Sequence, residues 1–187
     1  MALTLGTNCG FVTVAPTADP DGPDNLIANT RSNALKDVAP ATSAKVVEIG
    51  WYSNGTGTDV DTDIGLYDHK YGDDNPENRL STTTTTTGAD AGWKKVTGLD
   101  ISITAGVTYW LAFQCDADSK VTDNISTGGT RIAIKTSQTS LPDPWGTSAA
   151  ELDNHLIALY AVWETAPIPL ETTFNTSDAF TSISYIA

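Results

Sequence analysis

Three acidic residues spaced two apart, Asp59, Asp61 and Asp63, come nearest in this sequence to a metal site. In an extended strand their carboxylates would share one face, where oxygen ligands could hold Ca²⁺. An EF-hand loop that began at Asp59 would need Gly at its sixth position and Glu at its twelfth, but the sequence has Ile64 and Lys70 there. We therefore expect a solvated acidic strand edge, with a Ca²⁺ site as the alternative.

Two other acidic segments receive the same interpretation. One contains Asp19, Asp21 and Asp24, and the other contains Asp116, Asp118 and Asp123. Oxygen-rich spacing of this kind is common on acidic surfaces, so we assign no metal ligand and no cofactor to the chain.

Nucleophilic catalysis has little support in the sequence. The two histidines, His69 and His155, have the acidic neighbours Asp68 and Asp153, but neither lies in a nucleophile motif such as Gly-x-Ser-x-Gly. Carboxylates are too numerous to single out the pair that a glycosidase needs. We predict no enzyme activity and no catalytic residue, and we expect both histidines to be surface or capping residues.

Five tryptophans and six tyrosines raise the question of sugar binding, because sugars stack on aromatic faces. Trp51, Trp110 and Trp163 lie among aliphatic residues in β-prone runs, so we expect them in the core. Trp145 stands in a Pro-Trp-Gly turn and is the tryptophan that we expect at the surface. It would serve as a ligand platform or close one end of the domain.

A hydroxyl-rich run extends from Ser81 through Thr82–Thr87. An array that binds ice or glycan is one interpretation. Such an array needs repeats, and this chain has none, whereas threonine is a good strand residue. We therefore predict an exposed, half-buried or edge strand.

The formal net charge of −13 argues against a nucleic-acid partner, because phosphate binding needs clustered Lys and Arg. We expect Cys9 and Cys115 to be two buried thiols, with one disulfide as the alternative. The first residues have neither the basic nor the apolar region of a signal peptide, and no apolar run approaches the length of a membrane span. The sequence thus predicts synthesis in the cytosol and no membrane partner.

The elements that must position these residues are strands. The run Val107–Gln114 carries large apolar groups on both faces, so we expect a central strand that is covered on both sides. Further strands are expected at 45–52, 63–67, 93–96, 99–103, 131–135 and 156–163, and a polar loop at 68–79. Residues 26–38 predict a strand pair or a short turn of helix.

About eight to ten strands and no amphipathic helix predict an all-β fold, a single jelly-roll-like β-sandwich. A closed up-and-down barrel is the alternative, but its strands should be more even. We assign residues 1–163 to the sandwich, with an N-terminal strand segment at 3–14. Residues 164–187 are expected to form an extended C-terminal arm that docks on its own sheet or on a neighbouring subunit.

Four short motifs, taken in order, resemble those of a broad group of extracellular and phage-encoded β-sandwich domains. They are Glu48–Tyr52, Ile64–Tyr67, Gly92–Lys94 and Thr108–Ala112, and the resemblance covers about residues 45–163. These motifs are core and turn residues, so the resemblance implies a fold and carries over no binding or catalytic residue.

The resemblance implies a non-enzymatic virion structural protein of a tailed phage, a capsid decoration (cement) protein or a fibre-tip module. Such a protein is made in the host cytoplasm and located in the virion. Its expected partners are its own copies, with a homotrimer favoured, and other virion proteins such as a major capsid protein. The alternative is a lectin-like, carbohydrate-binding β-sandwich module whose partner is a cell-surface glycan.

Overall fold

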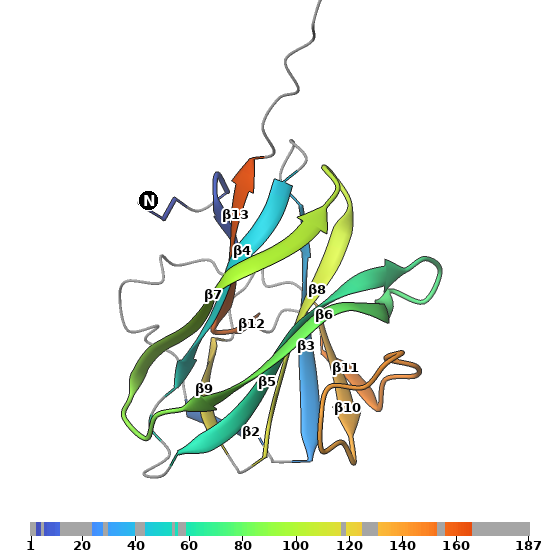
Figure 1. The fold of residues 1–187 in the computed structure, drawn as a ribbon. Helices are drawn as coiled ribbons and strands as arrows, with labels where there is room; N and C mark the ends of the chain where they lie inside the picture. Colours follow the sequence, from blue (N-terminus) through green and yellow to red (C-terminus); the bar gives the residue numbers. More distant parts are fainter. Residues whose placement is uncertain are drawn as a thin grey trace, which may run out of the picture.

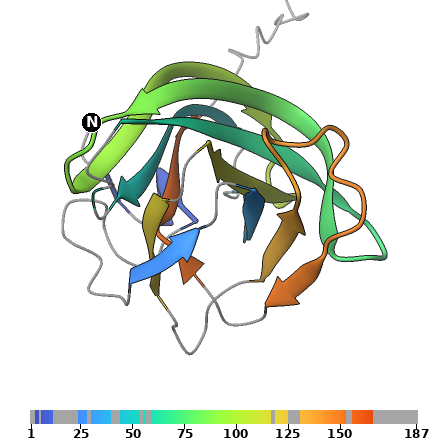
Figure 2. The same cartoon turned by 90° about the horizontal axis from the view of Figure 1, so that it is seen from below.

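The computed structural model confirms an all-β sandwich (Figures 1 and 2). Within the residues that it describes there are thirteen strands and no helix, and hence no helix long and apolar enough to cross a membrane. Those residues are 3–4, 6–11, 24–27, 30–39, 44–53, 55, 59–116, 119–124, 131–152 and 156–165.

The two sheets are antiparallel and differ in how their strands are ordered. The seven-stranded sheet has the order β1 (Cys9–Gly10), β13 (Leu159–Thr165), β4 (Ala44–Ser53), β9 (Ser119–Asn124) and β12 (Leu156–Ile157), with β2 (Asp24–Ile27) paired to β9 and β7 (Gly92–Ile103) paired to β4. The six-stranded sheet has the order β11 (Ala150–Leu152), β10 (Ile132–Thr136), β3 (Arg31–Val38), β8 (Thr108–Cys115), β5 (Val60–Lys70) and β6 (Asn75–Thr87).

Strand β8 is the central strand that its sequence predicts. It lies between β3 and β5, and every residue after Thr108 is buried. Leu111 and Phe113 face the seven-stranded sheet, where the ring of Phe113 lies 6.1 Å from that of Trp51. Trp110 belongs to a second apolar cluster on the opposite face. Apolar residues on both faces of β8 are therefore covered, as expected for such a strand.

The cover over the outer face of the six-stranded sheet is the segment 137–149. Its Leu141 and Trp145 pack on Tyr67 and Trp110 in the second apolar cluster. The prediction that Trp145 lies at the surface is wrong, because this side chain has no exposed area. The turn folds back onto the sheet, and the Trp145 N–H donates to the carbonyl of Glu77 at 2.8 Å.

Several predicted boundaries change. The expected loop at 68–79 is wrong, because β5 continues to Lys70 and pairs with β6, which starts at Asn75. The two strands expected at 93–96 and 99–103 form the single strand β7, in which Gly98 adopts a φ of +76°. Residues 26–38 contribute to two strands, β2 and β3, in different sheets.

Two other predictions are confirmed. The threonine run forms β6, an edge strand with alternating exposure. Cys9 and Cys115 are both buried, and neither forms a disulfide. The arm is expected at 164–187, but strand β13 continues through Thr165, so the first two of these residues belong to the sheet. Residues 166–187 lie outside the described residues.

Candidate functional site

The turn between β5 and β6 presents an exposed aromatic side chain that is connected to the core. Tyr71 is 78% exposed. Its ring contacts His69 edge-on at 5.2 Å, and His69 in turn stacks on Trp110 with ring centroids 6.2 Å apart. The buried indole N–H of Trp110 donates to Nδ1 of His69 at 3.1 Å. The proton of a neutral His69 imidazole is therefore on Nε2, which faces Asp74 at 3.9 Å.

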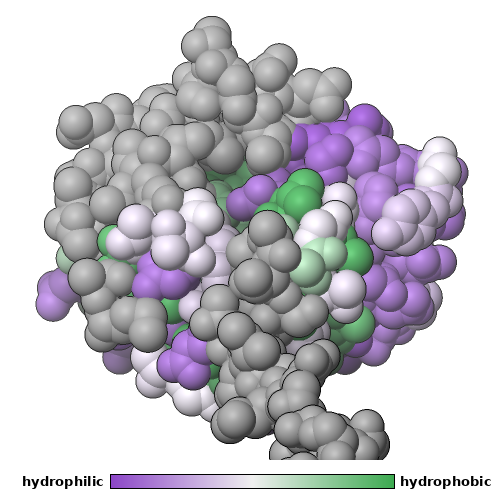
Figure 3. All heavy atoms as spheres, turned by 90° about the horizontal axis from the view of Figure 1, so that it is seen from above, coloured by the Kyte–Doolittle hydropathy of each residue, from purple (hydrophilic) through white to green (hydrophobic). Residues whose placement is uncertain are grey.

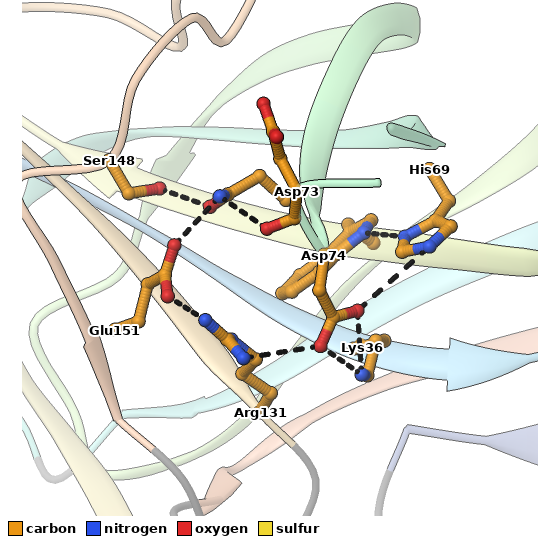
Figure 4. A network of polar contacts seen from close by, with 9 residues as sticks. Lys36, His69, Asp73, Asp74, Arg131, Ser148 and Glu151 are labelled. Atoms are coloured by element: carbon orange, nitrogen blue, oxygen red, sulfur yellow. Dashed lines mark hydrogen bonds and ion pairs between the residues drawn. The ribbon is translucent and has the colours of Figure 1, made fainter. Parts of the chain in front are cut away.

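Asp74 ends this turn and anchors it to the sheet (Figure 4). Its φ of +51° lies in the left-handed region, which Asp tolerates better than most residues. Both carboxylate oxygens accept from Nζ of Lys36 at 2.8 Å, and one also accepts from Arg131 at 3.3 Å. Desolvation raises the pKa of Asp74, but the hydrogen bond and charge of Lys36, followed by the charges of Arg131 and His69, outweigh it and hold that pKa below its usual range.

The network continues from Arg131 into the covering segment. Arg131 forms an ion pair with Glu151, whose other oxygen accepts from Nδ2 of Asn75 at 2.7 Å. Ser148 donates to Oδ1 of Asn75 at 2.6 Å and accepts from the indole N–H of Trp145 at 3.0 Å. The turn is thus tied to β3, to the start of β10, to β11 and to the segment 137–149 (Figure 4).

The charges around this turn nearly balance, although the whole chain carries −13. Two cations, Lys36 and Arg131, face two carboxylates, Asp74 and Glu151, at side-chain exposures between 24% and 37%. The arrangement provides an aromatic face beside half-exposed hydrogen-bond donors and acceptors. Such a surface suits a polar, uncharged ligand.

His69 departs from its prediction. We expected a surface or capping residue, but its side chain is only 13% exposed and accepts the hydrogen bond that the buried Trp110 needs. Tyr71 is not among the residues that the sequence singles out. Its one signal is its position between His69 and Gly72, where an aromatic residue enters a glycine turn.

The acidic segments considered as Ca²⁺ sites have other partners. Asp61 and Asp63 accept from the hydroxyls of Thr86 and Thr84 at 2.8 and 2.5 Å across the β5–β6 pair. Asp59 accepts from the N–H of Ala89 at 3.1 Å. In the described part of the chain, no group of three or more His, Cys, Asp or Glu side chains could hold a metal ion.

The remaining predicted positions are only partly described. The carboxylate of Asp116 accepts from the N–H of Asp61 at 3.0 Å. Asp24 and Asp123 lie in β2 and β9, but their side chains are outside the described part. Asp19, Asp21, Asp118 and His155 also lie outside it.

A second surface feature is an open groove of about 590 Å³ on the outer face of the seven-stranded sheet. Val47 and Val162 line it together with Glu48, whose carboxylate accepts from the hydroxyl of Tyr160 at 2.7 Å and pairs with Lys95 at 3.1 Å. Burial, and next the hydrogen bond that the hydroxyl donates to Glu48, raise the pKa of Tyr160 above its ordinary value.

The fold belongs to the class of antiparallel β-sandwiches. No family model and no curated protein matches the sequence. Among solved structures the chain is similar to the clostridial cysteine protease Cwp84 after propeptide cleavage, with a TM-score of 0.50 and 11% identity over 76% of this chain and 38% of that chain. It is also similar to the cysteine protease and lectin-like domains of Cwp84, a surface layer associated protein of Clostridium difficile. That match has a TM-score of 0.50 and 10% identity over 80% of this chain and 37% of that chain.

These similarities are at the level of the fold. The chain spans under two fifths of the length of either matched structure. At 10% and 11% identity they show the sandwich architecture alone, and they transfer no residue or activity.

Proposed function

We propose that this chain is a non-enzymatic, lectin-like module that binds carbohydrate at the turn formed by Tyr71–Asp74. The observation that carries the proposal is the Tyr71 ring, which is 78% exposed but held in place by His69 and, through it, by the core residue Trp110. An aromatic ring that is already fixed loses little conformational entropy when a ligand stacks on it.

The residues around Tyr71 suit the chemistry of a sugar. The apolar face of a pyranose can pack on the ring, while its hydroxyls exchange hydrogen bonds with the carboxylates of Asp73 and Asp74 and with the ammonium of Lys36. These groups are half-exposed or exposed and within one turn of the ring. The likeness to a solved structure described as containing lectin-like domains supports the same class.

A glycan array with the full chain tests this proposal. Tyr71→Ala should weaken binding at least tenfold, about 1.4 kcal/mol, while Tyr71→Phe should retain it. Leu80→Ala is the matched control, because Leu80 is also exposed (43%) but lies outside the turn. A wild-type chain that binds no glycan, or a Tyr71→Ala chain that binds as well as wild type, would contradict the proposal.

A structural role in a tailed-phage virion, as a decoration protein or fibre-tip module, is our second candidate. It is favoured by the end of the sandwich at which β13 finishes, where hydrophobic residues reach the surface (Figure 3). Among the described residues, Val38, at 54% exposure, is the large apolar side chain most exposed after Tyr71. Subunits that bury such an end would form homo-oligomers, with a trimer favoured.

Two measurements test this second candidate. Light scattering should give the mass of a trimer, and the protein should bind phage heads that lack decoration proteins in a fixed ratio. Val38→Asp should weaken both, and Leu80→Asp should weaken neither. A monomer with no affinity for any particle would refute the virion role and leave the carbohydrate proposal standing.

A further inference from the structure

The groove on the seven-stranded sheet has an apolar surface that nothing in the described part of the chain covers. Leu3, Val47, Leu99 and Val162 contribute apolar side chains to it. Gly98 contributes none, and a Cβ built on it would have no neighbour within 4 Å. The volume of about 590 Å³ falls within the ~300–1,000 Å³ of pockets that enclose a small ligand. A few large side chains would fill it.

The chain leaves β13 at the rim of this groove. Val162 and Glu164 line the groove, and Thr165 is the last residue of the strand. Residues 166–187 therefore begin beside it. An extended segment of that length reaches on the order of 70 Å, which is more than enough to return across the sheet.

The composition of this segment complements the groove. After Leu170 its large apolar residues are spaced among Ser and Thr, as Phe174, Phe180, Ile183, Tyr185 and Ile186. Its charged side chains are all acidic and it has no Lys or Arg. Lys95 lies on the groove wall with 57% of its side chain exposed, but it already pairs with Glu48, and Glu164 also lines the groove. The match is therefore apolar: a segment rich in large apolar side chains starts next to an uncovered apolar groove.

We propose that residues 170–187 turn back over β13 and bind in this groove of the same chain. Pro167 and Pro169 favour an extended backbone for the connection between Thr165 and the bound residues 170–187. Phenylalanine side chains occupy the space above Gly98, between Leu99 and Val162. The arm becomes an added layer of its own sandwich.

Limited proteolysis of the full chain tests this inference. Chymotrypsin cleaves after Phe174 and Phe180, and a synthetic peptide of residues 166–187 gives the cleavage rate without protection. We expect the wild-type chain to be cleaved at least tenfold more slowly than the peptide. Thr97→Trp, from an exposed position on the groove wall, should fill the groove and bring the rate toward that of the peptide.

The matched control is Thr82→Trp, an exposed threonine on β6 of the other sheet, which should leave the protection intact. Leu99→Asp is a second groove variant, with far-UV circular dichroism to show that each variant is folded. Cleavage of the wild type at the rate of the peptide would overturn the inference, as would folded Thr97→Trp and Leu99→Asp chains that stay protected. Protection that increases with protein concentration would also overturn it, because the occupant would then be the arm of a second copy.

Discussion

Replacing Trp145 by alanine should strongly destabilise the protein. The side chain is fully buried and packs edge-to-face on Tyr67 with ring centroids 5.3 Å apart. Its indole N–H donates to Ser148 at 3.0 Å. It is also a large member of the cluster that fixes the segment 137–149 on the six-stranded sheet. The substitution therefore removes packing on Tyr67 and leaves a cavity beneath the segment.

The expected decrease in the free energy of unfolding follows from the contacts that Trp145→Ala removes and those that it keeps. Truncation of a buried tryptophan to alanine costs about 3–5 kcal/mol through lost transfer energy and the residual cavity. Ser148 still donates to Asn75 at 2.6 Å, so its hydroxyl keeps one partner and adds little to the cost. Against a typical total of about 5–15 kcal/mol, this is a large part of the free energy of unfolding.

Urea unfolding followed by far-UV circular dichroism measures the loss without depending on the deleted fluorophore. Tyr71→Ala is the control, because an exposed side chain should change the free energy of unfolding by no more than about 0.5 kcal/mol. A loss below about 1 kcal/mol for Trp145→Ala, combined with complete loss of glycan binding, would refute our reasoning. Trp145 would then be a ligand contact and not part of the core.

Three further predictions concern titration and packing. Burial raises the pKa of Cys9 from 9.0 to about 11, so the stability that Cys9 contributes is complete below pH 9 and is lost as the pH rises toward 11. Burial also raises the pKa of Tyr160 from its ordinary 10.0, so its contribution is lost only as the pH rises above 10. Melting temperatures between pH 8 and 11 should therefore fall, less steeply for Tyr160→Phe. The pKa of Asp74 is lowered, so its contribution is present above pH 3.8 and lost below it, and Asp74→Asn should flatten the acid limb of a pH-stability curve. Gly50→Ala should cost about 1–3 kcal/mol in urea unfolding, because its Cβ would lie 2.2 Å from the Tyr160 ring. Gly88→Ala should cost no more than about 0.5 kcal/mol, because its Cβ would make only an ordinary contact with Nζ of Lys94 at 3.7 Å.

The core strands could be predicted because alternation and burial are local properties of the sequence. Val107–Gln114 shows apolar groups on both faces, and that pattern alone places it at the centre of a sheet. Gly50 shows the limit of this reasoning. The Glu48–Tyr52 motif that contains Gly50 is visible in the sequence. The need for glycine is not, because it comes from the ring of Tyr160 in β13, which lies where a Cβ would be.

The turn at Tyr71 could not be predicted for a related physical reason. Polar residues from Asp68 onward indicate a loop when they are considered one at a time. They form strands because Lys70 pairs with Asn75 across the hairpin, and because Asp74 meets Lys36 and Arg131 from distant strands. Trp145 is the converse case. A proline and a glycine indicate an exposed turn, but the sheet face that receives the indole is not visible in the local sequence.

Most of the polar residues near the turn have a structural role, so few residues are left whose presence only a ligand would explain. The indole N–H of Trp110 is buried and needs an acceptor, which His69 provides. Asp74 lies between two like charges, Lys36 and Arg131, and pairs with both. Neither argument extends to Tyr71, because a ring that is 78% exposed contributes little to the core. Its position on a rigid support is what a ligand-binding aromatic needs. Our proposed carbohydrate binding at this turn therefore depends mainly on the Tyr71 side chain.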